Sequence, residues 1–185
     1  GNGRLSYADG AVFTGDFKAD QREGSGTLTL PDGLTYVGQW QAGQINGTGK
    51  LNQPSGDVYE GSFTDGIRNG EGRVTYADGS VYEGSFTADQ RQGQGKFTGA
   101  DGSRYQGAFK QGEPSGQGTR SDAEGERFTG EFTHGQLNGQ GSYSGNDGAS
   151  YSGAFRDNQF HGQGRYESAE GEVWLGTFKQ GALTG

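Results

Sequence analysis

The chain has no cysteine, only three prolines among its 185 residues, and only 28% apolar residues. The absence of cysteine excludes disulfide bonds and thiolate metal sites, but it leaves the cellular compartment open. There is no apolar run of the roughly 18 residues that a membrane-spanning helix requires, and no apolar segment of a signal peptide. So few apolar side chains also argue against a conventional globular core.

The charge is acidic and evenly spread. Fifteen basic residues face 23 acidic ones, which gives a net charge of -8, and no four basic residues cluster. Such a field repels polyanions, so nucleic acid is not expected as a partner. Anionic lipid recognition requires clusters of Lys and Arg, so the charge also disfavours a membrane partner without excluding it.

What the chain does have is a strict internal period. An aromatic residue followed two positions later by glycine recurs every 23 residues. The eight aromatics are Phe13, Tyr36, Tyr59, Tyr82, Tyr105, Phe128, Tyr151 and Trp174. A fixed period of this length is typical of a repeat architecture, in which each unit packs only against its neighbours.

The rest of the unit follows the same register. Counting repeat positions 1 to 23 from each aromatic, glycine recurs at 3, 12, 14 and 21, Phe or Trp at 5, and an acid or Ser at 20. Of the 40 glycines, 38 fall at positions 3, 8, 12, 14 and 21. The array therefore divides into a half unit 1–12, whole units 13–35, 36–58, 59–81, 82–104, 105–127, 128–150 and 151–173, and a half unit 174–185. Because both ends fall in mid-unit, we expect the array to be part of a longer parent chain.

Each unit reads as a β-hairpin. Positions 1, 3 and 5 are aromatic, Gly and aromatic while positions 2, 4 and 6 are mostly polar, which is the alternation of a half-buried strand. A second strand is expected at positions 14 to 17, around the large residue of position 16. The predicted fold is all-β: an elongated, single-layer, twisted antiparallel sheet of successive hairpins without a globular core, about 75 Å long at 4.8 Å per strand.

The glycines suggest a register. If position 5 lies opposite position 14, position 3 lies opposite position 16, and each large side chain covers a glycine. A three-residue loop at positions 19 to 21 places position 16 opposite position 1 of the next unit, on the same face. Position 8 is Gly, Asp or Asn throughout, which predicts a turn residue with positive φ.

The pattern Y-x-G-x-F-x-x-G-x-x-x-G-x-G-x-x-x-x-x-D-G resembles the MORN repeat (membrane occupation and recognition nexus). Residues 59–81, YEGSFTDGIRNGEGRVTYADGSV, are similar to a consensus unit, and the resemblance covers the whole chain as about eight repeats. It implies a non-catalytic hairpin array that serves as a scaffold, a dimerisation element or a targeting arm of a larger protein. Because MORN arrays accompany many different domains, the resemblance does not identify a partner.

The large side chains of positions 1, 5 and 16 form an aromatic stripe on one face, and a single sheet leaves part of this stripe accessible. We therefore expect a long, shallow groove that binds a protein or peptide, or a second copy of the chain as a homodimer. The alternative is that the rings only pack on one another as the core. The groove residues would be Tyr36, Trp40, Tyr59, Phe63, Tyr82, Phe86, Phe97, Tyr105, Phe109, Phe132, Tyr151 and Phe155. Changing Tyr82 and Tyr105 to Ala is then expected to weaken binding while the fold remains.

Two other binding functions remain open at this stage. The first is peripheral phospholipid binding, which the family's name invites and the charge opposes. The second is carbohydrate binding, because evenly spaced aromatics flanked by Asp, Asn and Gln can stack on sugar rings.

An enzyme is the least supported class. The only histidines, His134 and His161, fall in different units and read as solvated turn residues. Aspartates before glycine, such as Asp78 and Asp101, read as turn residues rather than a catalytic pair. The spacing of a calcium loop is absent. We therefore expect no catalytic residues, no metal and no cofactor.

Overall fold

The computed structural model describes residues 1–185 as an all-β chain of 17 strands without a helix. It divides into two larger parts, which we call unit 1 (Gly1–Arg91) and unit 2 (Gln92–Gly185). Each contains several of the 23-residue repeats, and from here on "unit" means one of these two parts. The strands that begin in unit 1 are β1 (Asn2–Ser6), β2 (Val12–Lys18), β3 (Gln21–Thr29), β4 (Thr35–Gln41), β5 (Gln44–Asn52), β6 (Val58–Thr64), β7 (Ile67–Thr75), β8 (Val81–Thr87) and β9 (Gln90–Thr98). Those of unit 2 are β10 (Arg104–Lys110), β11 (Glu113–Ser121), β12 (Arg127–Thr133), β13 (Gln136–Ser144), β14 (Ser150–Arg156), β15 (Gln159–Glu167), β16 (Val173–Lys179) and β17 (Ala182–Leu183).

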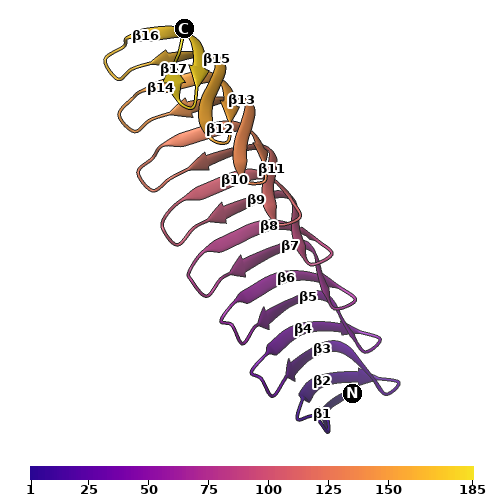
Figure 1. The fold of residues 1–185 in the computed structure, drawn as a ribbon. Coiled ribbons are helices and arrows are strands. Elements are labelled where there is room, and N and C mark those ends of the chain that lie inside the picture. Colours follow the sequence, from indigo (N-terminus) through magenta and orange to yellow (C-terminus); the bar gives the residue numbers. More distant parts are fainter. The chain divides into compact units, whose positions relative to one another are not determined.

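Within each unit, successive strands pair antiparallel in chain order, as the ladders of hairpins in Figure 1 show. The first strand of each hairpin covers the predicted alternating segment. The second strand begins at position 9 rather than 14, as β7 does at Ile67. It is longer than predicted because residues on both sides of the glycine at position 12 join the ladder.

A two-residue turn closes each hairpin. Thr64 pairs with Ile67, and both intervening residues are left-handed, with φ of 49° at Asp65 and 79° at Gly66. The positive φ predicted for position 8 is confirmed, also where Asp20, Asp89 or Asn158 replaces glycine. Position 7 was not foreseen as left-handed, because it is occupied by Ala, Asp, Gln and His. Two consecutive left-handed residues match the strand twist, so the tertiary pairing overrides the preference of these residues.

A three-residue loop joins each hairpin to the next, as predicted. In unit 1, the Tyr76 amide donates to the Ser80 carbonyl at 2.9 Å, and the Gly79 amide donates to the Tyr76 carbonyl at 2.9 Å. The Asp78 carboxylate accepts from the Ser80 amide at 2.8 Å and closes the loop. Position 16 consequently lies opposite position 1 of the next hairpin, as Val74 does opposite Tyr82.

The predicted register inside each hairpin is wrong. Gly61 pairs with Gly72, so position 3 lies opposite position 14. After a register shift, Phe63 at position 5 pairs with Arg68 at position 10. One residue of the first strand therefore faces three of the second, and this inequality bends the hairpin. The prediction assumed a regular ladder, which cannot include such a bulge.

The bend explains the paired glycines. A Cβ atom added to Gly61 would lie 2.5 Å from the Gly72 Cα atom. One added to Gly72 would lie 2.4 Å from the Tyr59 ring. The glycines do make room for an aromatic ring, as expected, but for the position 1 ring of their own hairpin.

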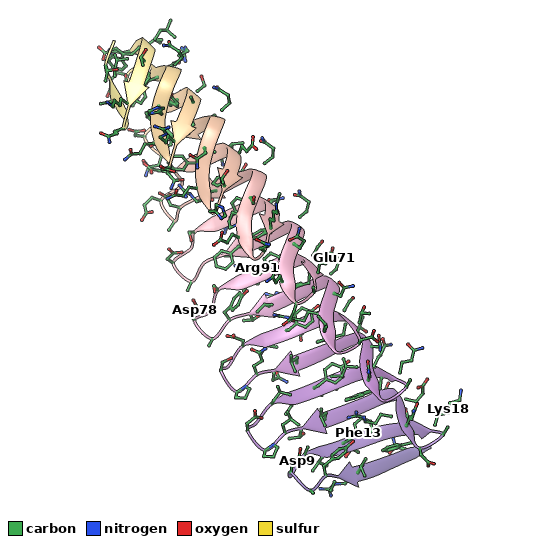
Figure 2. All side chains as sticks on the ribbon, turned by 45° about the vertical axis from the view of Figure 1, so that its right-hand side comes forward. Asp9, Phe13, Lys18, Glu71, Asp78 and Arg91 are labelled. Carbon is green, nitrogen blue, oxygen red and sulfur yellow. The ribbon has the colours of Figure 1, made fainter.

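The core of each unit is a ladder of edge-to-face aromatic rings. Phe63 lies between the rings of Tyr59 and Tyr36, with centroid distances of 5.0 and 5.4 Å, because each position 5 ring packs on its own and on the preceding position 1 ring. In Figure 2, Phe13 lies between an edge marked by Asp9 and Asp78 and the opposite edge marked by Lys18. Edge-to-face pairs at these distances add stability beyond the burial of area.

Candidate functional site

The tyrosines of position 1 are held by their hydroxyl groups as well as by packing. The Tyr59 hydroxyl donates to the Ser62 carbonyl at 2.8 Å, and the same bond joins Tyr82 to Ser85 and Tyr105 to Ala108. The accepting carbonyl belongs to position 4, where the hairpin bends. Burial raises the pKa of Tyr59, Tyr82 and Tyr105 to about 12. These hydroxyls are therefore neutral donors at ordinary pH.

The expectation of an accessible aromatic groove is wrong for eleven of its twelve residues. No more than 5% of the surface of any of these is exposed: Tyr36, Trp40, Tyr59, Phe63, Tyr82, Phe86, Tyr105, Phe109, Phe132, Tyr151 and Phe155. Only Phe97 is half-buried. Because the hairpin bends, the side chain of repeat position 10 lies over the rings of positions 1 and 5. The rings are therefore covered on both sides by residues of the same sheet. Tyr82→Ala and Tyr105→Ala are consequently expected to destabilise the fold, contrary to the sequence-based expectation.

In unit 1, position 10 covers the core, with arginine in three hairpins and Ile45 in the fourth. The Arg68 guanidinium lies 5.5 Å from the Tyr59 ring and 5.1 Å from the Phe86 ring. It also bonds to Asp89 of the next hairpin through the side chain and, at 2.9 Å, through the backbone carbonyl. Arg22 lies 4.3 Å from the Trp40 ring and donates to the Gly43 carbonyl at 2.6 Å. We call the sheet face that carries the rings of positions 1 and 5 the inner face. In unit 1 this face thus presents fixed cations.

In unit 2, position 10 is occupied by Pro114, Leu137, Phe160 and, in the last half unit, Leu183. Phe160 stacks on Tyr151 with a centroid distance of 4.0 Å and an interplanar angle of 9°. Leu137 is fully buried, and its methyl group would lie 2.9 Å from a Cβ atom added to Gly130. The cover of the core here is apolar.

Phe128 departs from the pattern of the other position 1 rings. A Cβ added to Gly141, its paired glycine, would meet the Phe155 ring at 3.3 Å rather than the position 1 ring. Phe128 is half-buried, with its ring 5.0 Å from that of Tyr143 and 5.0 Å from the Arg120 guanidinium. Leu137 takes the interior space and leaves Phe128 nearer the surface.

Phe128 begins a set of neighbouring rings that we call the aromatic run. Its members are Phe128, Tyr143, Phe160, Tyr166 and Trp174, and successive centroids are 5.0, 5.5, 6.2 and 5.5 Å apart. The first four are half-buried, and Trp174 is 38% exposed. Phe160, Tyr166 and Trp174 also line an open cavity of about 410 Å³, together with Phe178 and Leu183. The run is a contiguous group of rings on the inner face that remains partly accessible.

The three-residue loops beside the aromatic run form an acidic rim. Its residues are Asp122, Glu124, Glu126, Asp147, Glu170 and Glu172. The Tyr143 hydroxyl donates to the Glu126 carboxylate at 2.8 Å, which joins the rim to the run. Burial, with the Glu126 carboxylate next, raises the pKa of Tyr143 to about 12. Glu124, Glu170 and Glu172 are exposed, and no cation contacts their carboxylates.

The outer face is polar. In unit 1, Lys50 pairs with Glu60 at 3.0 Å and Arg73 pairs with Glu83 at 3.3 Å. In unit 2, the Thr119 and Thr129 hydroxyls lie 3.1 Å apart. Exposed ion pairs of this kind add little stability, so this face is solvated and carries no apolar surface for a partner apart from single residues.

His134 lies in a turn and is exposed, as predicted, whereas the prediction of a solvated turn is wrong for His161, which lies in β15 and is half-buried. His134 contacts the Glu113 carboxylate at 3.0 Å, and both side chains are mostly exposed. No three His, Cys, Asp or Glu side chains gather as a metal-binding group. The structure contains no helix with the length and hydropathy needed to span a membrane.

The MORN repeat family matches residues 13–35, 36–58, 59–81, 82–104, 105–127, 128–150 and 151–173. The chain therefore belongs to the MORN repeat family. The match comprises seven repeats, whereas the sequence pattern predicted about eight. The family is one of repeats, and it does not indicate an enzyme.

No curated protein matches the chain. Among solved structures, the chain is similar to the TCP domain of SAS-4 (dCPAP) in complex with a proline-rich motif of Ana2 (dSTIL) from Drosophila melanogaster, with a TM-score of 0.53, 13% identity, and coverage of 96% of this chain and 90% of that chain. The TCP10 domain of Danio rerio CPAP has a TM-score of 0.47, 18% identity, and coverage of 96% and 89%. A streptogramin B lyase has a TM-score of 0.22, 12% identity, and coverage of 96% and 67%. The first likeness shows a shared fold alone.

Sequence reasoning missed position 10 altogether. The arginines there resemble surface residues, and their chemistry changes along the chain from Arg22 to Leu137 to Phe160. The one shared property of position 10, that no Gly, Asp or Ser occupies it, is too weak to mark it as a core position. Position 16 was recognised as large, but its two tyrosines, Tyr143 and Tyr166, were not singled out as a site.

Proposed function

We propose that the chain is a non-catalytic scaffold array that binds a protein or peptide partner as the interaction arm of a larger protein. The observation that carries this proposal is the aromatic run of unit 2, where five neighbouring rings stay partly accessible on a face most of whose other rings are buried. Accessible contiguous apolar surface usually marks a partner site. Trp and Tyr are also the side chains that dominate binding energy in interfaces.

The similar fold of the SAS-4 TCP domain supports the proposal by analogy, because that domain was solved in complex with a peptide motif. At 13% identity the analogy concerns the architecture and no particular residue. The contact residues we assign are those of the aromatic run. The twelve residues of the predicted groove then support the surface from below rather than touch the partner, with Phe97 as the exception.

Panning a random peptide phage library tests the proposal. The selecting surface is the intact chain, and the comparison is the double variant Tyr143→Leu and Tyr166→Leu. Leucine is the resident of position 16 at Leu28 and Leu51, so these substitutions remove rings without disturbing the fold. We expect peptides that bind the chain and lose most of their affinity for the variant.

Leu175→Ser is the matched control, because Leu175 is 73% exposed and lies next to Trp174 on the opposite face. Its binding should equal that of the unmodified chain. Failure to select any peptide, or peptides that bind both variants equally, would overturn the assignment of the run as the binding surface.

A further inference from the structure

The inner faces of the two units differ in charge as well as in apolar surface. In unit 1, Arg22 and Arg68 lie over the rings and are fixed by carbonyl or carboxylate partners. In unit 2, position 10 carries no cation, and the neighbouring loops carry six acids. Arg120 is the cation of the unit 2 face, over Phe128 at one end of the aromatic run. The exposed carboxylates of Glu124, Glu170 and Glu172 have no cationic partner, so they can attract a cationic segment to the other part of the run.

We propose that the aromatic run and the acidic rim of unit 2 bind a proline-rich, basic segment in the polyproline II conformation. This inference rests on the proposed function and specifies its partner. Polyproline segments dock on surfaces lined by aromatic rings, because the rings fit between prolines and the peptide is already ordered before it binds.

The spacing of the repeat favours this conformation over a helix. Two strands separate equivalent positions, such as Tyr143 and Tyr166, and at about 4.8 Å per strand the repeat advances about 9.6 Å. Polyproline II advances about 9.3 Å per three-residue turn, so two residues three apart can meet Tyr143 and Tyr166. An α-helix advances about 10.8 Å in two turns, and its mismatch of about 1.2 Å accumulates with each repeat.

The rim supplies the preference for basic residues. The carboxylates of Glu124, Glu170 and Glu172 are exposed and have no cationic partner. Glu126 is held beside the Tyr143 ring by the hydroxyl of that residue. A peptide that places prolines on the rings can direct an Arg of each turn toward these carboxylates. The interior of the hairpins is already filled by buried rings, so the peptide lies on the surface and does not insert.

Fluorescence anisotropy with a labelled synthetic peptide of four Pro-Pro-Arg triplets tests the proposal. Two further peptides separate conformation from charge: four Gly-Ser-Arg triplets, which keep the charge and lose the conformation, and four Pro-Pro-Gln triplets, which do the reverse. We expect Pro-Pro-Arg to bind at least about tenfold more tightly than either, a difference that anisotropy resolves readily. Equal binding of Pro-Pro-Arg and Gly-Ser-Arg would reduce the interaction to charge alone and overturn the proposal.

Variants of the chain locate the site. Tyr143→Leu with Tyr166→Leu should weaken Pro-Pro-Arg binding about tenfold or more, and Glu170→Gln with Glu172→Gln should weaken it several-fold and reduce its salt dependence. Glu60→Gln with Glu83→Gln removes the same charge from the outer face of unit 1 and should leave binding unchanged. A loss of binding equal to that of the rim variant would assign the effect to net charge and contradict the site.

The phage panning and the anisotropy measurements together distinguish a failure of the polyproline proposal from a failure of the proposed peptide-binding function. If phage panning selects peptides that depend on Tyr143 and Tyr166 but contain no prolines, the partner class is wrong and the binding surface stands. If panning selects nothing and Pro-Pro-Arg does not bind at millimolar concentration, both fail.

Discussion

The two units are built on the same repeat, yet they close their cores in different ways. In unit 1 the covering residue of position 10 is mostly a charged guanidinium held over the rings, as at Arg68, with Ile45 as the exception. In unit 2 it is apolar, and at Leu137 it enters the core and displaces the neighbouring Phe128 toward the surface. The difference shows that the repeat conserves the rings of positions 1 and 5, whereas position 10 varies and, at Leu137, coincides with a position 1 ring that is less deeply buried.

Each unit contains one tryptophan, which allows the comparison to be tested unit by unit. Trp40 lies in the core of unit 1 and Trp174 lies in unit 2. Trp174→Phe leaves a fluorescence reporter for unit 1, and Trp40→Phe leaves one for unit 2. Phenylalanine is the usual residue at position 5, so the latter change is mild.

The largest contrast is expected at position 10. Leu137→Ala should lower the free energy of unfolding by about 3 kcal/mol, because it leaves a cavity at a fully buried site. Arg68→Ala should cost about 1 kcal/mol or less, because its ion-pair partner Asp89 is exposed. Urea unfolding followed by the tryptophan of each unit measures both. Equal losses would mean that the two covers are equivalent and would remove the basis of the comparison.

The next contrast concerns the glycine beneath the position 1 ring. Gly72→Ala should destabilise unit 1 by about 2 kcal/mol, because its Cβ would lie 2.4 Å from the Tyr59 ring. Gly141→Ala should cost less, because its Cβ would meet no ring atom closer than 3.3 Å and its one short contact would be with the Thr129 carbonyl oxygen at 2.7 Å. The same urea titrations give the two values. A larger loss at Gly141 would contradict the displacement of Phe128.

A smaller contrast is expected from single hydroxyl groups. Tyr59→Phe removes the bond to the Ser62 carbonyl and should cost about 1 kcal/mol. Phe128→Tyr adds a hydroxyl to a ring that has left the interior and should change stability by less than about 0.5 kcal/mol. If Phe128→Tyr instead stabilises unit 2 as much as Tyr59→Phe destabilises unit 1, the ring of Phe128 occupies the ordinary interior place.

The smallest effect appears only in alkaline solution. Burial raises the pKa of Tyr59 from 10.0 to about 12, so the unfolded chain loses this proton at lower pH than the folded chain. The contribution to stability is complete below pH 10 and is lost as the pH rises toward 12. Thermal unfolding from pH 8 to 11 should decline less steeply for Tyr59→Phe than for the unmodified chain. Parallel declines would show that this tyrosine titrates normally in the fold.

The period of the sequence was sufficient to predict the hairpins, the three-residue loops and the left-handed position 8. It did not predict that Gly61 faces Gly72, because a bulge leaves no mark in an alternating pattern and the paired glycines suit either register. The site was predicted less well. A stripe of rings on one strand face indicates burial on that face, but whether a further segment covers it depends on the bend that the bulge produces.

The aromatic run illustrates the same limit at single residues. Tyr59 and Phe128 occupy the same repeat position, but their surroundings differ. Leu137 stands where Arg68 does, nine residues after the ring, and Tyr143 stands where Val74 does. Sequence alone assigns them equal roles. The structure separates them because the interior of one hairpin holds a single bulky group at this point, and leucine competes for it where arginine does not.

The hydroxyl bond of position 1 lies within one strand, and the ring contact of position 5 reaches no further than the preceding hairpin. Each 23-residue repeat therefore makes the same two interfaces, one with the preceding repeat and one with the following repeat, as its neighbours do. If a whole repeat is gained or lost, the repeats that become neighbours form the same kind of interface that the chain already contains. Arrays of this kind can change length during evolution by whole repeats. The few positions that differ between repeats, such as 10 and 16, can diversify independently from one repeat to the next.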